Sequence, residues 1–425
     1  MVGSVTAKPN VLVILCDDMG AHEIGLYGNK LHKTPNLDAL GETGIWFTTG
    51  WSTPICHPTR FQIMTGQYGH HHGVYQFPKR PGGPPVPNEG ADDISKHLTF
   101  GKIFKDAGYA TAMAGKWQLS GKHPTLIKET GFDTYRMWAY THNLPKGAIH
   151  TGAWEGKPGT KTCRYWHPCI VENGKHLQTT KDSYGPDMFC DFLIDFMKEN
   201  KEKPFFAYYP MALTHDKFYT TPDSTKTVED RFVHNRKKNW QANVEYTDKI
   251  IGRLVGALDE LAIRDNTLVI FVGDNGTGGD GKAKTTERGV RVPFIANGPG
   301  IVKPTGECRE LVDLSDIVPT ICEVAGIDLP KDHIIDGVSF APYLRGDLTP
   351  RREWIYAYLG LKRVVRTKRW LLENNSMSEF GQLYDCGESR DGTGYREVTA
   401  SEDAEVVAAK ALMTQIFADK PVPER

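Results

Sequence analysis

Short apolar segments that end in paired polar residues are the feature that most constrains the fold of this chain. Val11–Cys16 is followed directly by two aspartates, and Leu268–Val272 is followed by the triplet Gly-Asp-Asn. Unbroken apolar runs of this length are typical of strands buried on both faces, and they alternate here with helical segments such as Arg231–Leu261. We therefore predict an α/β fold with a large mixed, mostly parallel sheet sandwiched between helices.

The last part of the chain has a different pattern. Three apolar stretches after residue 349 look like short strands, and Ala404–Ala418 has the period of an amphipathic helix. We predict one large domain over residues 1–348 and a small C-terminal α+β subdomain over 349–425, made of a short antiparallel sheet and a terminal helix. Residues 140–183 are rich in Gly, Pro and aromatic residues without a clear period, which predicts a long loop or insertion.

The composition excludes several classes of protein. With 51 Lys and Arg against 52 Asp and Glu, the net charge is −1, and no basic stripe interleaved with aromatic residues supports nucleic-acid binding. No apolar run approaches the roughly 20 residues needed to span a bilayer, and no paired Cys spacing predicts a zinc site. The first ten residues lack the regions of a secretory signal, so the protein is either cytoplasmic or its leader is absent from this sequence.

The polar residues after the two apolar segments are Asp17, Asp18, Asp274 and Asn275. In open α/β sheets, ligands bind beyond the carboxyl ends of the strands, where these side chains are expected to meet. Carboxylate and amide oxygens suit Ca²⁺ or Mg²⁺ rather than zinc or copper. The alternative is that the first pair caps a helix and the second forms a turn.

A cysteine motif gives the most specific indication of chemistry. Cys56 begins the pentapeptide CHPTR, which ends at Arg60 and is followed by FQIMTG. By itself a cysteine here is either a nucleophile or a buried thiol. The motif gains weight from the segments around it, because they occur in a recognisable order along nearly the whole chain.

That order resembles the sulfatase family of the alkaline phosphatase superfamily. The segments that carry the resemblance are PNVLVILCDDMG, TPNLDALGETGIWFTTGWSTPICHPTRFQIMTG, AGKWQLS, FFAYYPMALTH, LVIFVGDNG, ERGVRVPFIANGPG and QLYDC. The resemblance implies an alkaline-phosphatase-like fold and a sulfuric ester hydrolase that acts on a sulfated carbohydrate or another sulfate ester. It also implies a periplasmic or secreted enzyme, with a cytoplasmic one as the alternative.

In sulfatases this cysteine is oxidised to formylglycine, so the resemblance implies a formylglycine-generating enzyme as a partner that recognises Pro58 and Arg60. Thr59 replaces the usual serine or alanine. The hydrated aldehyde attacks the sulfur of the ester, and its second hydroxyl expels sulfate. The resemblance further implies Ca²⁺, or Mg²⁺, held by Asp17, Asp18, Asp274, Asn275 and the modified Cys56.

The same resemblance assigns roles to the remaining site residues. Arg60 would hold the hydrate and offset charge at the metal, Lys116 and Lys282 would bind sulfate, and His215 would protonate the leaving alcohol. Gln118 stands where sulfatases often have a histidine that helps to expel sulfate, and glutamine cannot take a proton. Another base would be His57 or one of His70–His72, although the histidine run is more typical of a loop feature. If no other group acts as the base, turnover is slow or sulfate is expelled by a different chemistry.

Several alternatives remain open at this stage. One is a phosphonate or phosphate monoester hydrolase, and another is a catalytically impaired homologue that binds sulfated glycans. A phosphate-binding loop at GTGGDGK is disfavoured, because Ala283 stands where such a loop needs Ser or Thr. The basic cluster over residues 362–369 either contacts a polyanionic sugar or faces solvent. Disulfides between Cys163 and Cys169 and between Cys308 and Cys322 are possible pairings. The sequence does not indicate an oligomeric state.

Overall fold

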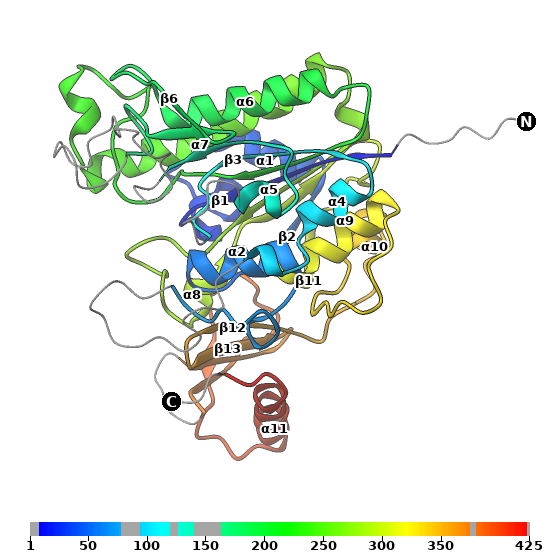
Figure 1. Ribbon diagram of the computed structural model, residues 1–425. Helices are drawn as coiled ribbons and strands as arrows, with labels where there is room; N and C mark the ends of the chain where they lie inside the picture. The colour runs from blue at the N-terminus through cyan, green and yellow to red at the C-terminus, as the bar shows by residue number, and fades with distance from the viewer. Residues whose placement is uncertain (1–7, 78–93, 120–125, 140–162, 375–379, 423–425) are drawn as a thin grey trace, which may run out of the picture.

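The computed structural model describes residues 8–77, 94–119, 126–139, 163–374 and 380–422, which form two sheets with helices around them (Figure 1). The larger sheet has eleven strands in the described part of the chain. Their spatial order is β11 (Gly306–Asp313), β2 (Ile45–Trp51), β10 (Phe294–Asn297), β8 (Thr267–Gly273), β1 (Asn10–Cys16), β7 (Phe205–Pro210), β3 (Ala110–Gly115), β4 (Thr134–Trp138), β5 (Ile170–Glu172) and β6 (Lys175–Leu177), while β9 (Arg291–Val292) pairs with β2.

The prediction of a mixed sheet between helices is confirmed. The strands β8, β1, β7, β3 and β4 run parallel to one another in the centre. Antiparallel pairings occur toward the edges, where β10 pairs with β8 and β2, and β5 pairs with β4 and β6. A further parallel pairing, of β11 with β2, lies at one edge, so parallel and antiparallel pairings are about equally frequent and the sheet is less parallel than predicted. The parallel strands in the middle of the sheet carry the predicted site.

Strand β1 shows why this sheet needs two layers of helices. All seven of its residues are buried, and successive side chains point to opposite faces. Val11, Val13 and Leu15 pack into one apolar core, and Leu12, Ile14 and Cys16 pack into the other. The unbroken apolar run in the sequence is thus explained by burial of both faces.

The helices divide between the two faces, as Figure 1 shows. One core contains side chains from α2 (Cys56–Thr65), α4 (Phe100–Asp106), α5 (Leu126–Glu129), α9 (Ile317–Ala325) and α10 (Ala341–Leu344). The other contains side chains from α1 (Pro35–Glu42), α6 (Gly185–Glu199) and α7 (Arg236–Glu260). The predicted long helix corresponds to α7, which begins after the N-cap Asn235.

A separate antiparallel sheet lies near the C-terminus, as predicted. It consists of β12 (Trp354–Leu359), β13 (Lys362–Thr367), β14 (Trp370–Asn374), β15 (Gln382–Asp385) and β16 (Arg396–Glu397). The helix α11 (Ala404–Asp419) packs on one face through Met413 and Phe417, and the other face packs on Trp51 of the larger sheet. The division of the chain at residue 348 stays a prediction, and residues 140–162 of the predicted insertion lie outside the described residues.

Two short helices, α3 (Gly69–His72) and α8 (Glu287–Val290), lie on connections that contact the second sheet. Among the residues that the structure describes, no helix combines the length and the apolar character that a membrane span requires. All eight cysteines are buried free thiols, so the pairs Cys163–Cys169 and Cys308–Cys322 are not bridged. The disulfide hypothesis is therefore wrong, and these side chains act as small apolar groups in the cores.

Candidate active site

The register of the two central strands brings the predicted acidic residues together. Cys16 of β1 pairs with Gly273 of β8, so Asp17 and Asp274 follow at the same edge of the sheet. The backbone N–H of Asp274 donates to the carbonyl oxygen of Cys16 at 2.8 Å. The N–H of Asp18 donates to Oδ1 of Asp274 at 2.9 Å, which fixes the orientation of that carboxylate.

The side chains of Asp18 and Asn275, the second residues of the two polar pairs, join those of Asp17 and Asp274. Asp18 has a φ of 59°, a conformation that aspartate adopts more readily than most residues. The side-chain amide of Asn275 donates from Nδ2 to Oδ1 of Asp18 at 2.9 Å. All four side chains are at most 3% exposed, so the structure brings together Asp17, Asp18, Asp274 and Asn275 as predicted.

Cys56 is the first residue of α2 and is 2% exposed. Ile55 before it has extended backbone angles, so the chain turns into the helix at this residue. The Sγ atom of Cys56 and one carboxylate oxygen each from Asp17 and Asp274 all lie within 4.8 Å of one another. The positive end of the helix thus faces the carboxylates, an arrangement that stabilises negative charge.

Arg60 lies one turn further along α2 and is buried beneath Cys56. Its Nη2 donates to Oδ2 of Asp274 at 2.9 Å and lies 3.7 Å from Oδ1 of Asp17. Its Nη1 donates to the carbonyl oxygen of Lys116 at 2.7 Å. These contacts raise the pKa of Arg60 although burial alone would lower it, so the guanidinium is a fixed positive charge in the site.

Lys116 reaches the site from the end of β3. The Nζ atom lies 2.6 Å from Oδ2 of Asp17, and both side chains are essentially buried. Gly115 before it has a φ of 120°, and a Cβ there would lie 2.0 Å from the carbonyl oxygen of Pro210. Glycine is therefore needed for β3 and β7 to approach where Lys116 N–H donates to Pro210 at 2.7 Å.

Lys282 reaches the site from a glycine-rich loop after β8. Its Nζ lies 2.6 Å from Oδ1 and 2.8 Å from Oδ2 of Asp18. A Cβ on the preceding Gly281 would lie 1.9 Å from the carbonyl oxygen of Arg288. The glycines thus let the loop fold tightly on itself, which accounts for the resemblance of GTGGDGK to a phosphate-binding loop.

His215 follows β7 and lies beside the carboxylate of Asp18. Its Nε2 is 3.8 Å from Oδ2 of Asp18, and its Nδ1 lies 2.6 Å from the carbonyl oxygen of Asp216. A carbonyl can only accept, so Nδ1 carries the proton and Nε2 is the basic nitrogen. Burial and the charge of Lys116 lower the pKa of His215, although about a fifth of its side chain, 22%, is exposed.

The pKa values of Asp274 and Asp17 shift in opposite directions, because several carboxylates lie close together in this buried site. Burial and the charge of Asp17 raise the pKa of Asp274 to about 8. Burial would also raise the pKa of Asp17, but the ammonium group of Lys116 lowers it to about 2. A divalent cation among these oxygens would offset the repulsion between the carboxylates.

The residues present fit such a cation. The Oδ1 atoms of Asp17 and Asn275 are buried and accept no hydrogen bond within the described chain. Buried oxygens without a partner are costly unless they bind a ligand. Carboxylate and amide oxygens are the donors that Ca²⁺ and Mg²⁺ prefer, so the donor set agrees with the predicted metal.

Gln118 follows Lys116 closely and has a φ of 58°. Its Oε1 is buried and has no hydrogen-bond partner within the described chain, whereas its backbone oxygen lies 3.2 Å from Nδ1 of His57. His57 is fully buried on α2 next to Cys56. The predicted alternatives for the base are His57 and the run His70–His72, and His57 is the one that lies near Gln118.

The histidine run lies elsewhere. It follows the C-terminal end of α2, and the ten residues of this helix place it about 15 Å from Cys56 at about 1.5 Å per residue. In addition, both ring nitrogens of His72 are occupied, by the N–H of Val74 and the hydroxyl of Tyr358. This placement agrees with the interpretation of the run as a structural feature rather than a catalytic one.

Most of the basic cluster over residues 362–369 is paired within the chain. Arg366 is fully buried and lies 2.6 Å from Glu287 at the start of α8. Lys368 pairs with Glu310, and Arg369 pairs with Asp385 and Glu405. The interpretation of this cluster as a binding surface for a polyanionic sugar is therefore not supported; Arg366 instead ties the second sheet to the loop that carries Lys282.

Three residues outside the predicted set support the site. The hydroxyl of Thr59 donates to the carbonyl oxygen of Asp274 at 2.7 Å, which links α2 to β8. Thr277 accepts from Gly20 N–H at 3.2 Å and donates to Glu23 at 2.7 Å, so the loops after β1 and β8 are held together. Glu23 is only 6% exposed, and no sequence pattern marks it, because an acid in a polar stretch predicts exposure.

Comparison with known proteins agrees with this geometry. A family model described as Sulfatase matches residues 9–327, and a second one, described as N-sulphoglucosamine sulphohydrolase, C-terminal, matches residues 281–415. The chain belongs to the sulfatase family. As a sulfatase it is a sulfuric ester hydrolase, as the resemblance in the sequence implied.

Individual relatives of this sulfatase show different substrates in their names. N-acetylgalactosamine-6-sulfatase of Sus scrofa is 30% identical over 89% of this chain and 74% of that protein. Steryl-sulfatase of Mus musculus is 27% identical over 87% of this chain and 70% of that protein. A solved structure in complex with its substrate D-glucosamine-2-N,6-O-disulfate has a TM-score of 0.77, with 19% identity over 98% of this chain and 100% of that one.

Proposed function

We propose that this sulfatase hydrolyses sulfate esters of a carbohydrate through a formylglycine made from Cys56 and a bound divalent cation. The observation that carries the proposal is the position of Cys56, at the buried start of α2 and within 4.8 Å of Asp17 and Asp274. When Cys56 has been converted by a formylglycine-generating enzyme, the hydrated aldehyde would supply one hydroxyl to attack the sulfur and a second hydroxyl to expel sulfate, which a thiol lacks. Asp17, Asp18, Asp274 and Asn275, with the modified Cys56, would hold Ca²⁺ or Mg²⁺, which supplies positive charge for the developing negative charge.

The cationic side chains bind and orient the sulfate group. An ammonium group has three N–H donors, so Lys116 and Lys282 retain donors beyond those that their carboxylate partners accept. Lys282 is the more accessible of the two, with 20% of its side chain exposed. Arg60 is fixed by Asp274 and the Lys116 carbonyl, and therefore keeps positive charge beneath the reacting residue.

His215 is in place to donate a proton to the leaving alcohol. Its Nδ1 is occupied by the Asp216 carbonyl, so a second proton would reside on Nε2, which faces Asp18. Burial keeps the pKa of the imidazole low in the structure described. The negative charge of a bound sulfate ester favours the protonated ring, so we propose that proton uptake accompanies substrate binding.

A carbohydrate sulfate is the substrate class that we propose. Relatives named for N-acetylgalactosamine 6-sulfate and a solved complex with a disulfated glucosamine support this choice. The alternative, a phosphate monoester hydrolase, requires the site to stabilise one more negative charge than a sulfate ester brings. The direct test compares turnover of 4-nitrophenyl sulfate with that of 4-nitrophenyl phosphate.

We expect turnover of the sulfate ester to exceed turnover of the phosphate ester by at least tenfold. We also expect the enzyme to release sulfate from a 6-sulfated hexosamine. A preference for the phosphate ester would overturn the assignment. A protein whose Cys56 is fully converted but which binds sulfated glycans without turnover would instead be the impaired homologue.

Removal of the cation should abolish activity and lower the melting temperature. Ligand binding to the folded state alone stabilises it by mass action, and the buried carboxylates would otherwise repel one another. Dialysis against a calcium chelator, followed by turnover of an aryl sulfate and a thermal melt, measures both effects. Re-addition of Ca²⁺ should restore them, and full activity in the chelator would contradict the assignment of the four oxygen ligands.

Gln118→His should raise turnover by about 10- to 100-fold, because a positioned general base contributes about 100-fold or more to the step that it assists. Histidine tolerates a positive φ better than most residues, so the backbone conformation can be kept. Single-turnover kinetics should show faster release of sulfate with little change in the first step. An unchanged rate would indicate that another group, such as His57, already acts as the base.

A further inference from the structure

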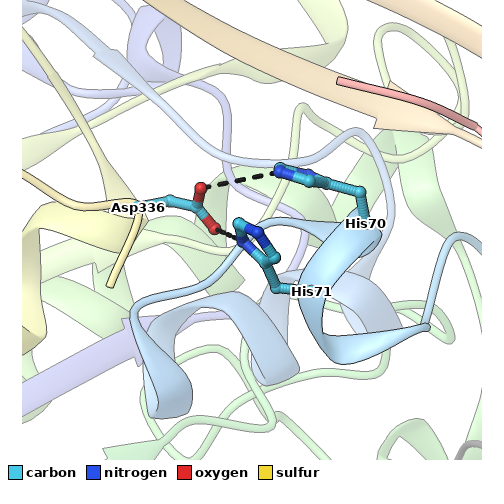
Figure 2. A group of neighbouring side chains, drawn as sticks. All are labelled: His70, His71 and Asp336. Carbon is cyan, nitrogen blue, oxygen red and sulfur yellow. Dashed lines mark hydrogen bonds and ion pairs between the residues drawn. The ribbon is translucent and has the colours of Figure 1, made fainter. Parts of the chain in front are cut away.

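A second group of potential metal ligands lies away from the active site, between α3 and the connection from α9 to α10. Figure 2 shows that the imidazole rings of His70 and His71 both point toward the carboxylate of Asp336. His70 Nε2 lies 3.7 Å from Oδ1, and His71 Nδ1 lies 2.7 Å from Oδ2. In the described part of the chain, the other two such groups both contain Asp17 and belong to the active site.

The carboxylate of this group is held in position before any ligand binds. Oδ2 of Asp336 accepts from the N–H of Tyr68 at 2.7 Å, and the N–H of Asp336 donates to the carbonyl oxygen of Gly66 at 2.9 Å. Only 6% of the Asp336 side chain is exposed, against 10% for His70 and 27% for His71. The three side chains therefore form a largely buried group in which His71 is the most exposed member.

We propose that His70, His71 and Asp336 bind a transition-metal ion, Zn²⁺ or a chemically similar divalent ion, with water in the remaining position. Two imidazole nitrogens and one carboxylate oxygen are the donors that such ions prefer, whereas Ca²⁺ prefers oxygen alone. This site is distinct from the cation site beside Cys56 in its ligands and its place. It does not depend on the proposed function.

The geometry needs only small changes to accept the ion. Metal–ligand distances of about 2.0–2.1 Å put the ligand atoms of a tetrahedral site about 3.3 Å apart. The distances from the two nitrogens to the carboxylate, 2.7 Å from His71 to Oδ2 and 3.7 Å from His70 to Oδ1, lie on either side of this value, and the three ligand atoms lie within 4.8 Å of one another. His71 would bind through Nδ1 and keep its proton on Nε2, and His70 would bind through Nε2 and keep its proton on Nδ1.

Nearby positive charge limits the affinity. Arg352 donates to the carbonyl oxygen of Asp336 at 3.3 Å, and the ammonium group of Lys420 adds its positive charge near His70. With three protein ligands and these cations near, we expect a dissociation constant on the order of micromolar, weaker than that of four-ligand structural zinc sites. The bound ion would join α3 to the α9–α10 connection and so stabilise the folded chain.

The test is a calorimetric titration of Zn²⁺ into protein without a polyhistidine tag and in saturating Ca²⁺, which occupies the oxygen-ligand site. We expect one Zn²⁺ per chain and a rise in melting temperature of several degrees. His71→Gln and Asp336→Asn should each weaken binding at least tenfold, and Asp336→Asn keeps an oxygen for the Tyr68 N–H. Co²⁺ should give intense visible bands in the unaltered protein and lose them in both variants.

His167→Asn is the matched control, because it removes a partly buried histidine elsewhere, and asparagine tolerates its φ of 48°. This variant should bind Zn²⁺ with unchanged affinity. Aryl sulfate turnover in Ca²⁺ should be unchanged in all the variants, which shows that they are folded. Equal Zn²⁺ affinity in the unaltered protein and in His71→Gln, or no binding to either, would overturn the proposal.

Discussion

Replacement of Cys56 by alanine is expected to lower aryl sulfate turnover by a factor on the order of 10⁴ or more, because removal of a nucleophile eliminates most of the catalysis that a site provides. Alanine suits the start of a helix, and the side chain lost is small. The fold should therefore persist, with nearly the same thermal melting curve. Initial rates in saturating Ca²⁺ measure the effect.

Cys322→Ala is a matched control for this change. Cys322 is also buried and helical, but it lies in the apolar core on α9. Its replacement should leave the turnover number within a factor of about two, since it removes only packing. If the two alanine variants were equally active, Cys56 would not be the nucleophile.

The mass of the tryptic peptide Thr34–Arg60 tests the same residue without kinetics. After expression in a host with a formylglycine-generating enzyme, the peptide should have lost the sulfur of Cys56 and gained an aldehyde oxygen. The intact thiol in such a host would mean that the motif is not converted, although Arg60 and Pro58 are present. The formylglycine part of the proposal would then fail, while membership of the sulfatase family would stand.

The sequence predicts the position of the site well because two central strands end in the residues that form it. Burial of β1 and β8 on both faces leaves an unbroken apolar signal, and their register then places Asp17 beside Asp274. The same local signals locate α7 and the terminal helix. These features depend on short stretches of chain, which is why they can be predicted from it.

Features that depend on distant partners are not predictable in this way. Arg366 is one member of a basic run, and its partner Glu287 is 79 residues away, so a buried ion pair looks like an exposed charge. Glu23 similarly depends on Thr277, 254 residues further along. The strand order of the sheet is also set by long crossovers, so the sequence does not show that β2 lies between β10 and β11.

The second large effect is expected at the cation site beside Cys56. Asp17→Asn is expected to weaken Ca²⁺ binding at least 100-fold and to lower aryl sulfate turnover by a similar factor or more, because the amide brings no charge to the site. Asp17 is also the partner of Lys116 at 2.6 Å, and both side chains are buried. Loss of one partner of a buried pair costs about 3–5 kcal/mol of the free energy of unfolding.

Asp316→Asn separates the two consequences. Asp316 is equally buried and pairs with Arg352, and it belongs to none of the groups of candidate cation ligands in the described chain. Its replacement should cost a comparable part of the unfolding free energy, measured by urea denaturation, but leave Ca²⁺ affinity unchanged. Asp17→Asn should therefore lose both Ca²⁺ affinity and unfolding free energy, whereas Asp316→Asn should lose unfolding free energy alone. Equal Ca²⁺ affinity in the two variants would mean that Asp17 has only a structural role, since the cation would then be held without its carboxylate.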